Sequence, residues 1–162
     1  MGNTTVLRQR IRKLLESRGF TYDSRQSPQC MNFRRISPTD VHLLAINWEK
    51  TGRPRFVVMF SKAGKRGVVY HGELVLASDL LIEHSPKLGF LAPKDHRFTQ
   101  GWFRLDPALL YRLLHPRFRG IESVVEQFAS LLNEIEEYWS TGSVGPHIRF
   151  APEPRPWVAN AA

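Results

Sequence analysis

The sequence predicts one α+β domain, in which an antiparallel β-meander of about five strands is packed by an N-terminal helix and a long C-terminal helix. Helical periodicity of apolar residues occurs near both ends of the chain, over residues 6–18 and 121–139. Between these segments, short runs rich in Val, Ile, Phe and Tyr alternate with turn residues, which is typical of a meander. With 162 residues, of which 42% are hydrophobic, the chain can form one packed core.

The first helix is expected over residues 6–18, because Leu7, Ile11, Leu14 and Leu15 recur on one helical face. Asn3 to Thr5 offer capping side chains, and Gly19 is a stop signal. The opposite face is basic and consists of Arg8, Arg10, Arg12, Lys13 and Arg18. A basic face of this kind is either a solvated surface or a surface that binds a polyanion.

Five segments are the strand candidates, at residues 20–25, 30–36, 41–48, 55–62 and 68–71. The sequence Ser37-Pro38-Thr39-Asp40 predicts a tight turn that joins the second and third candidates into a hairpin. Residues 73–82 fit a strand and a buried helical turn equally well, since periodicity does not separate the two in a short apolar run. The meander is thus predicted from both its strands and its turns.

The following segment is expected to be a long surface loop over residues 85–100, because proline and glycine interrupt it repeatedly. Trp102 to Leu105 is expected to be a short strand, and Asp106-Pro107 predicts the start of a short helix. The loop is a candidate functional segment, since long loops in compact domains often carry function.

The clearest predicted element is the long helix, whose apolar stripe runs from Ile121 to Trp139 and ends before Gly142. Four prolines follow between residues 146 and 156, so residues 143–162 are expected to be a tail without regular structure. The predicted organisation is therefore a single domain over residues 1–142 followed by a proline-rich tail.

The charge of the chain favours an acidic partner. There are 23 Lys and Arg against 15 Asp and Glu, which gives a formal charge of +8. The charge is unevenly distributed, because residues 120–142 contain five Glu and no Lys or Arg, which leaves the rest of the chain at +13. We therefore expect a basic sheet side and N-terminal helix set against an acidic C-terminal helix.

The sequence offers little support for enzymatic chemistry, and no cofactor or metal is expected. Cys30 is the only cysteine, and no phosphate-binding loop or nucleophile elbow occurs. A nuclease site would have to use Asp40, Glu49 and Lys50, and these residues do not suit one face of a strand. The remaining enzyme hypothesis is a site in the 84–100 loop that uses His84, Asp95 and His96; the two histidines are also the one metal-ligand pair considered.

The basic residues on or between the predicted strands are the candidate binding residues, either for a protein partner or for nucleic acid. They are Arg34, Arg35, Arg53, Arg55, Lys65 and Arg66. Lys62 belongs to the same basic stretch, and Phe33, Trp48 and Tyr70 lie beside it in the sequence. Arginine beside aromatic residues can hold phosphates and stack bases. Strand alternation nevertheless places Arg34 and Arg35 on opposite faces of the sheet, and most of the aromatic residues are expected in the core.

Several short motifs resemble those of the uncharacterised bacterial proteins grouped as domain of unknown function 4304. They are Leu15-Glu16-Ser17-Arg18-Gly19-Phe20, Asn32-Phe33-Arg34-Arg35, Ala45-Ile46-Asn47-Trp48-Glu49-Lys50, Arg55-Phe56-Val57-Val58-Met59-Phe60 and Gly101-Trp102-Phe103-Arg104-Leu105. The resemblance covers residues 6–140. It implies an α+β domain and no established activity, in small bacterial proteins of which some act as toxin-neutralising immunity proteins.

The sequence thus predicts a non-enzymatic binding module that engages an acidic protein partner, as a toxin-immunity protein or a mobile-element accessory protein. The alternatives are a nucleic-acid-binding protein that uses the basic sheet face and an enzyme with a site in the 84–100 loop. No apolar run reaches the roughly 20 residues of a membrane span, and the N-terminus lacks the apolar segment of a signal peptide. A cytoplasmic location is therefore expected.

Overall fold

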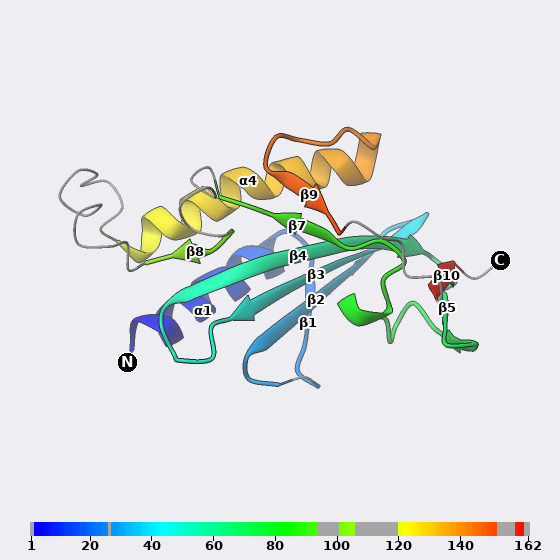
Figure 1. The fold of residues 1–162 in the computed structure, drawn as a ribbon, viewed down its shortest axis with the longest axis horizontal. Coiled ribbons are helices and arrows are strands. Elements are labelled where there is room, and N and C mark those ends of the chain that lie inside the picture. Colours follow the sequence, from blue (N-terminus) through cyan, green and yellow to red (C-terminus); the bar gives the residue numbers. More distant parts are fainter. Residues whose placement is uncertain (1, 26, 94–100, 106–119, 152–157, 161–162) are drawn as a thin grey trace.

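The fold was analysed in a computed structural model of the chain (Figure 1), which describes residues 2–25, 27–93, 101–105, 120–151 and 158–160. The predicted helix at residues 106–114 lies outside the described residues. The described elements are α1 (Asn3–Ser17), β1 (Thr21–Asp23), β2 (Cys30–Ile36), β3 (Asp40–Trp48), β4 (Arg55–Gly64), β5 (Val68–Tyr70), β6 (Glu73–Val75), the 3₁₀ turn η1 (Ile82–His84), β7 (Gly89–Leu91), β8 (Phe103–Arg104), α4 (Ile121–Thr141), β9 (Ile148–Phe150) and β10 (Val158–Asn160).

The large sheet is antiparallel throughout, with the strand order β1-β2-β3-β4-β7-β9. Strand β8 also pairs with β4, next to the β3–β4 turn, where Phe56 lies opposite Phe103. Strands β1 to β4 form the predicted meander by successive antiparallel pairing. The α+β class, the meander and the two covering helices are thus confirmed.

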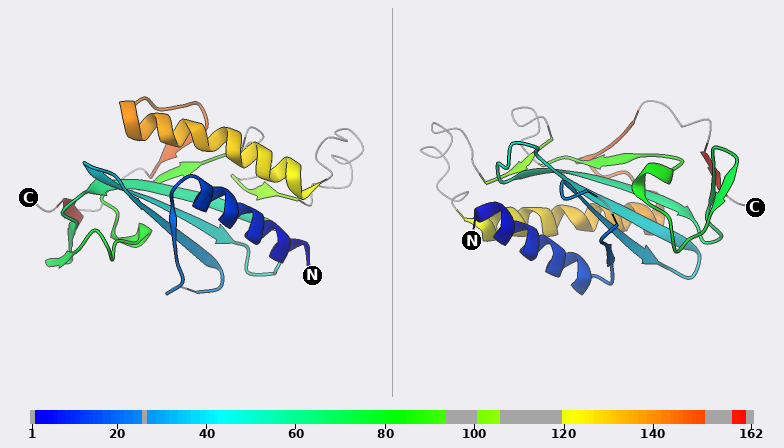
Figure 2. Two further views of the ribbon diagram at one scale, coloured as in Figure 1. Left: turned by 180° about the vertical axis from the view of Figure 1, so that it is seen from behind. Right: turned by 90° about the horizontal axis from the view of Figure 1, so that it is seen from below.

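One side of the large sheet is covered by both helices, which lie in front of the strands when the molecule is seen from behind (Figure 2, left). The apolar stripe of α1 buries Leu7, Ile11 and Leu15, and α4 buries six residues at helical spacing. They pack on inward side chains of the central strands, including Leu44 of β3 and Phe60 of β4. The main core therefore lies between the helices and this side of the sheet, which we call the covered side.

The opposite side of the sheet carries a smaller core near the β4–β5 turn, formed by Val41, Leu43, Ala45, Ala63, Val68, Leu80 and Ile82. Segment 68–84 covers it, because the chain leaves β4, forms β5 and β6 and returns over the sheet at η1. Arg34 fixes this segment, since its guanidinium donates to the Leu80 carbonyl at 2.8 Å and pairs with Asp23 at 3.5 Å. Segment 68–84 therefore shields this part of the sheet, on the side opposite the helices, from solvent.

Three sequence-based expectations were wrong. The fifth predicted strand does not extend the meander: β5 pairs with β6 and β10 in a separate three-stranded sheet. The expected 85–100 loop contains β7, whose Gly89 lies against the Phe60 ring so closely that any Cβ there would overlap it. Prolines did not exclude regular structure after residue 143, because β9 lies between Pro146 and Pro152 and β10 follows Pro156.

Other boundaries follow the local signals. The helix α4 ends at Gly142, which adopts the left-handed conformation (φ 80°) and donates its N–H to the Tyr138 carbonyl. The ambiguous 73–82 segment contains β6 and no helical turn before η1. No helix in the described part of the chain is both long and apolar enough to cross a membrane.

Candidate binding surfaces

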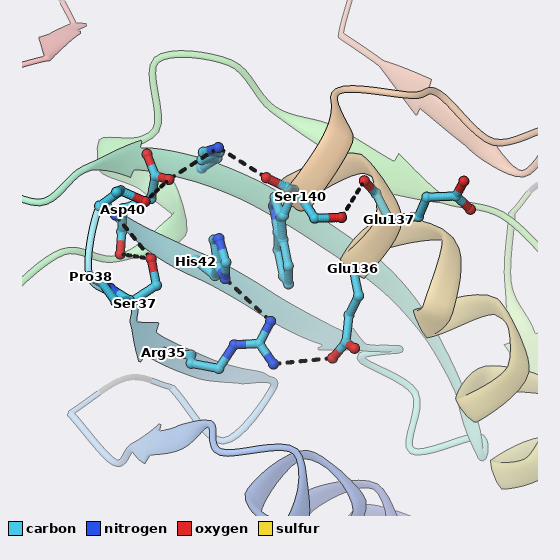
Figure 3. Close-up of a pocket in the computed structure, with 11 residues that line it drawn as sticks. Arg35, Ser37, Pro38, Asp40, His42, Glu136, Glu137 and Ser140 are labelled. Atoms are coloured by element: carbon cyan, nitrogen blue, oxygen red, sulfur yellow. Dashed lines mark hydrogen bonds and ion pairs between the residues drawn. The ribbon is translucent and has the colours of Figure 1, made fainter.

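The covered side contains a pocket of about 650 Å³ at the end of α4, where it meets the β2–β3 turn (Figure 3). Its walls come from the turn residues 37–40, from Arg35 and His42 of β2 and β3, from Lys62 of β4 and from the last turn of α4. Ser37 closes the turn, because its hydroxyl donates to the Asp40 carbonyl and accepts from the Asp40 N–H. The pocket is therefore built on a rigid hairpin.

Arg35 lines this pocket, and three polar partners hold its guanidinium. It pairs with Glu136 at 3.1 Å, donates to the Arg18 carbonyl at 3.0 Å and donates to Nδ1 of His42 at 3.3 Å. The guanidinium also lies 4.5 Å from the centre of the Phe20 ring. Arg35 thus joins β2 to both helices and acts within the fold.

His42 is neutral near pH 7, because burial and the adjacent Arg35 charge lower its pKa to about 4. Its ring stacks on Trp139, with centroids 4.3 Å apart and planes 4° from parallel. Since Nδ1 accepts from Arg35, the single proton of the neutral ring lies on Nε2. A neutral, stacked histidine that accepts from a fixed arginine is a structural link between strand and helix.

Lys62 completes the pocket with a similar arrangement. Its ammonium donates to the Trp139 carbonyl at 3.0 Å, at the negative end of α4, and pairs with Asp40 at 3.1 Å. Both cations of the pocket therefore have carboxylates of the chain as partners. This region holds the hairpin, the sheet and α4 together, and carboxylates of the chain neutralise both of its cations.

The same balance extends along α4. Its glutamates contact basic side chains of other elements: Glu122 pairs with Arg10 at 3.2 Å, Glu136 pairs with Arg18 at 3.4 Å and with Arg35, and Glu134 forms a hydrogen bond with the His147 ring at 2.5 Å. The expected division between a basic and an acidic surface is therefore reduced, because two of the five glutamates of α4 neutralise arginines of the chain itself.

The second candidate surface lies on the side of the sheet away from the helices, at the end near the β3–β4 turn. We call it the open surface and define it by six half-buried residues, Arg55, Val57, Met59, Phe90, Trp102 and Arg104. Three of them alternate along β4 with core residues Phe56, Val58 and Phe60, so they point away from the helices. Phe90 of β7 pairs with Met59, and Arg104 of β8 pairs with Arg55, so the six form one continuous patch.

The packing of this patch differs from that of a core. Met59 packs partly against the smaller core, whereas Val57 and Phe90 belong to neither core among the described residues. The Arg55 guanidinium lies 5.0 Å from the centre of the Trp102 ring and pairs with Glu49, whose pKa it lowers by hydrogen bonding. Half-exposed Trp, Met, Phe and Arg side chains in one patch have the composition of the centre of a protein interface.

The structure separates the six arginines and lysines predicted from the sequence. Arg34 is held by Asp23 and Leu80, and Arg35 lies in the pocket on the covered side. Arg53 is exposed in the β3–β4 turn, beside the open surface, whereas Lys65 and Arg66 are exposed in the turn at the other end of β4. Only Arg55 of this set belongs to the open surface.

The predicted sites for other chemistry receive little geometric support in the described residues. Asp40 and Glu49 lie at opposite ends of β3, so they do not form a shared nuclease site. In the loop hypothesis, Asp95 and His96 lie outside the described residues. The ring of His84 accepts from the Leu81 N–H, and burial lowers its pKa. No cluster of three potential metal ligands occurs among the residues that the structure describes.

Sequence reasoning missed Trp102, Arg104, Met59 and Phe90. A signal for two of them was present, because a strand over 102–105 places Trp102 and Arg104 on one face and Phe103 on the other. No protein-family model matches the chain, and searches of curated proteins and of solved structures gave no match either. The resemblance to domain of unknown function 4304 thus stays a prediction.

Proposed function

We propose that the chain is a non-enzymatic binding module that engages a protein partner through the open surface. The observation that carries this proposal is the continuous patch of half-exposed Val57, Met59, Phe90 and Trp102 beside two arginines. Side chains of these types bury a large apolar area and pair with polar groups when a partner excludes water.

Charge supports an acidic partner. The described carboxylates are largely paired within the chain, as in the Glu136 and Asp40 contacts of the pocket, so they do little to offset the excess of cations. Arg53 is exposed next to the open surface and forms no ion pair within the described residues. A positive field at the rim of an apolar patch increases the rate of encounter with an acidic protein. A role as an immunity or mobile-element accessory protein is one setting for such a partner.

Capture experiments with matched variants test this proposal. The protein is immobilised and exposed to a nuclease-treated lysate of its source cells, and the captured proteins are quantified by mass spectrometry. We expect a partner that wild type retains, that Val57→Glu and Phe90→Glu lose, and that the control Gln9→Glu on the exposed face of α1 retains. Circular dichroism checks that each variant is folded. A partner retained equally by all three variants would contradict the proposal.

Nucleic-acid binding remains the second candidate, because the stacked Arg55 and Trp102 side chains also suit bases and phosphates. It predicts that binding to labelled oligonucleotides falls steeply as salt rises, since binding to phosphates releases counterions. The two functions separate in the capture experiment. If nuclease treatment removes every captured protein, the nucleic-acid function replaces the protein-binding function.

A further inference from the structure

The small sheet has one unpaired edge. Its strand order is β10-β5-β6, so β6 is an outer strand, and none of the described strands pairs with its second edge. The sheet lies at the end of the molecule away from the N-terminus (Figure 1). An outer strand presents backbone N–H and C=O groups that can pair with another chain. This edge is therefore a candidate contact surface.

The turn between β5 and β6 determines which residue faces that edge. Tyr70 pairs with Glu73 across a two-residue turn. Both turn residues, His71 and Gly72, have positive φ, 49° and 84°, which is the geometry of a type I′ hairpin. The residues that flank such a turn exchange hydrogen bonds, and hydrogen-bonded pairs alternate along the ladder. The N–H and C=O of Leu74 therefore point away from β5, and within the described residues they form no hydrogen bond.

Two exposed leucines accompany these backbone groups. Leu74 is 57% exposed and Leu76 is 54% exposed, and they are two of the four exposed large apolar side chains in the described part of the chain. Residues two apart in an extended chain share one face, so Val75 points to the other face, where it packs on the smaller core. Unpaired backbone groups and exposed apolar side chains thus coincide at β6.

We infer that β6 pairs in antiparallel fashion with β6 of a second copy of the chain, about a two-fold axis at Val75. The alternation of side chains restricts the register, because residues opposite each other must lie on the same face. With Val75 opposite Val75 of the second copy, each Leu74 lies opposite Leu76 of the other copy. The interface then covers both exposed leucines of each copy and gives the Leu74 N–H and C=O their partners. This surface is separate from the open surface, so the inference does not rest on the proposed function.

Charge favours a second copy as the occupant of this edge. Lys65 and Arg66 are exposed in the turn before β5. A Cβ on Gly67 would overlap the Val75 carbonyl oxygen, so this turn packs against the end of β6. In the antiparallel pair, Glu73 at the start of one β6 lies beside the end of the other and approaches its basic turn. The two copies of Glu73 lie about 13 Å apart, beyond the Debye length of about 8–10 Å.

The association is expected to be weak, because two such short strands bury less than the roughly 1,200 Å² of a stable interface. We expect a Kd on the order of 100 µM. Sedimentation velocity of the full chain, from about tenfold below to about tenfold above this Kd, tests the inference. The sedimentation coefficient of wild type should rise with concentration toward the value of a dimer.

Matched variants locate the interface. Leu74→Thr and Leu76→Thr should each weaken self-association about tenfold or more, because symmetry makes each change remove two leucine contacts. The control is Val144→Thr, which removes a similarly exposed apolar side chain (55%) after α4 and should leave self-association unchanged. Wild type that sediments as a monomer at every concentration would overturn the inference, as would equal effects of Val144→Thr and Leu74→Thr.

Exchange of charges tests the two-fold register. Glu73→Lys places a lysine beside the basic turn of the second copy and should weaken self-association about fivefold. Adding Lys65→Glu and Arg66→Glu to this variant should restore most of the loss. A Glu73→Lys variant that associates as tightly as wild type would overturn the register and the inference with it. Circular dichroism checks that each variant is folded.

Failure of this inference is distinguishable from failure of the proposed function. If Leu74→Thr does not alter self-association while Phe90→Glu abolishes partner capture, the inference is wrong and the proposed function stands. If Leu74→Thr abolishes self-association while Phe90→Glu retains the partner, the second copy binds at β6 and the proposed function of the open surface is wrong.

Discussion

The two sides of the large sheet use arginine in opposite ways. On the covered side, Arg35 has a carboxylate, two further acceptors and two aromatic rings around its guanidinium. On the open surface, Arg104 faces another arginine across the strand pair. The position of an arginine in the sequence therefore says little about its role. The acceptors that the fold places around its guanidinium decide whether it stabilises the fold.

Adjacent residues make the same point within one strand. Arg34 and Arg35 are neighbours in β2 and therefore point to opposite sides of the sheet. Arg34 holds segment 68–84 on the smaller core, and Arg35 holds α4 on the main core. The sequence predicted both arginines as binding residues, but both are used in contacts within the fold.

The largest expected difference between the two sides concerns two tryptophans. Trp139→Ala is expected to lower the free energy of unfolding by about 3–5 kcal/mol, because its buried ring packs on His42, Phe20 and Phe60. Trp102→Ala on the open surface should cost about 1 kcal/mol, mainly for its contact with Arg55. Urea unfolding measures both. Equal losses would show that the open surface is part of the structural core.

A pair of arginines gives the next largest effect. Arg35→Ala is expected to cost about 2 kcal/mol, because it removes a charge-assisted hydrogen bond to Glu136 and leaves the Arg18 carbonyl without this donor. Arg53→Ala in the exposed turn should stay within about 0.5 kcal/mol of wild type. The same denaturation experiment compares them. An Arg35→Ala variant as stable as wild type would show that the contacts of Arg35 in the pocket do not stabilise the fold.

Acid should destabilise the protein through the covered side. The folded-state pKa of His42 is about 4, below its ordinary value of 6.5, so the unfolded chain binds protons more readily. Stability is therefore full above pH 6.5 and is lost as the pH falls toward 4. Replacing His42 with Gln should reduce this slope between pH 7 and pH 4.5, measured by urea unfolding. His84 has a pKa that burial lowers in the same direction, so some slope should remain.

The smallest effect is expected at the β4–β5 turn. Lys65→Ala combined with Arg66→Ala should alter the free energy of unfolding by less than about 0.5 kcal/mol, because both side chains are exposed. Capture of the partner should fall about twofold at most, since this turn lies at the other end of β4 from the open surface. A larger loss of capture would place the binding surface at this turn.

The parts of the fold that local signals determine were predictable. Cys30 to Ile36 was predicted to the residue, and the apolar stripe of α4 gave its extent up to Gly142. The strands β7, β9 and β10 were not predictable, because each has three residues and forms through pairing with distant segments. Proline between such short strands does not interrupt their hydrogen bonding, so the proline signal was misleading.

The candidate site was less predictable for a related reason. Alternation along β2 correctly separated Arg34 from Arg35, but it does not show which face the helices cover. The pairing of Arg55 with Arg104 depends on β8 joining β4 across 48 intervening residues, which no local pattern reveals. The sequence predicted Arg53, Lys65 and Arg66 as binding residues because of their charge, and all three lie in turns.

A site-specific photo-cross-linker tests most directly whether the open surface is the binding surface. The cross-linking residue replaces Phe90 in one protein and Gln9, on the exposed face of α1, in the other, and both are irradiated in nuclease-treated lysate of the source cells. We predict a discrete cross-linked protein adduct from position 90 and none from position 9. An adduct from position 9 with none from position 90 would contradict the account.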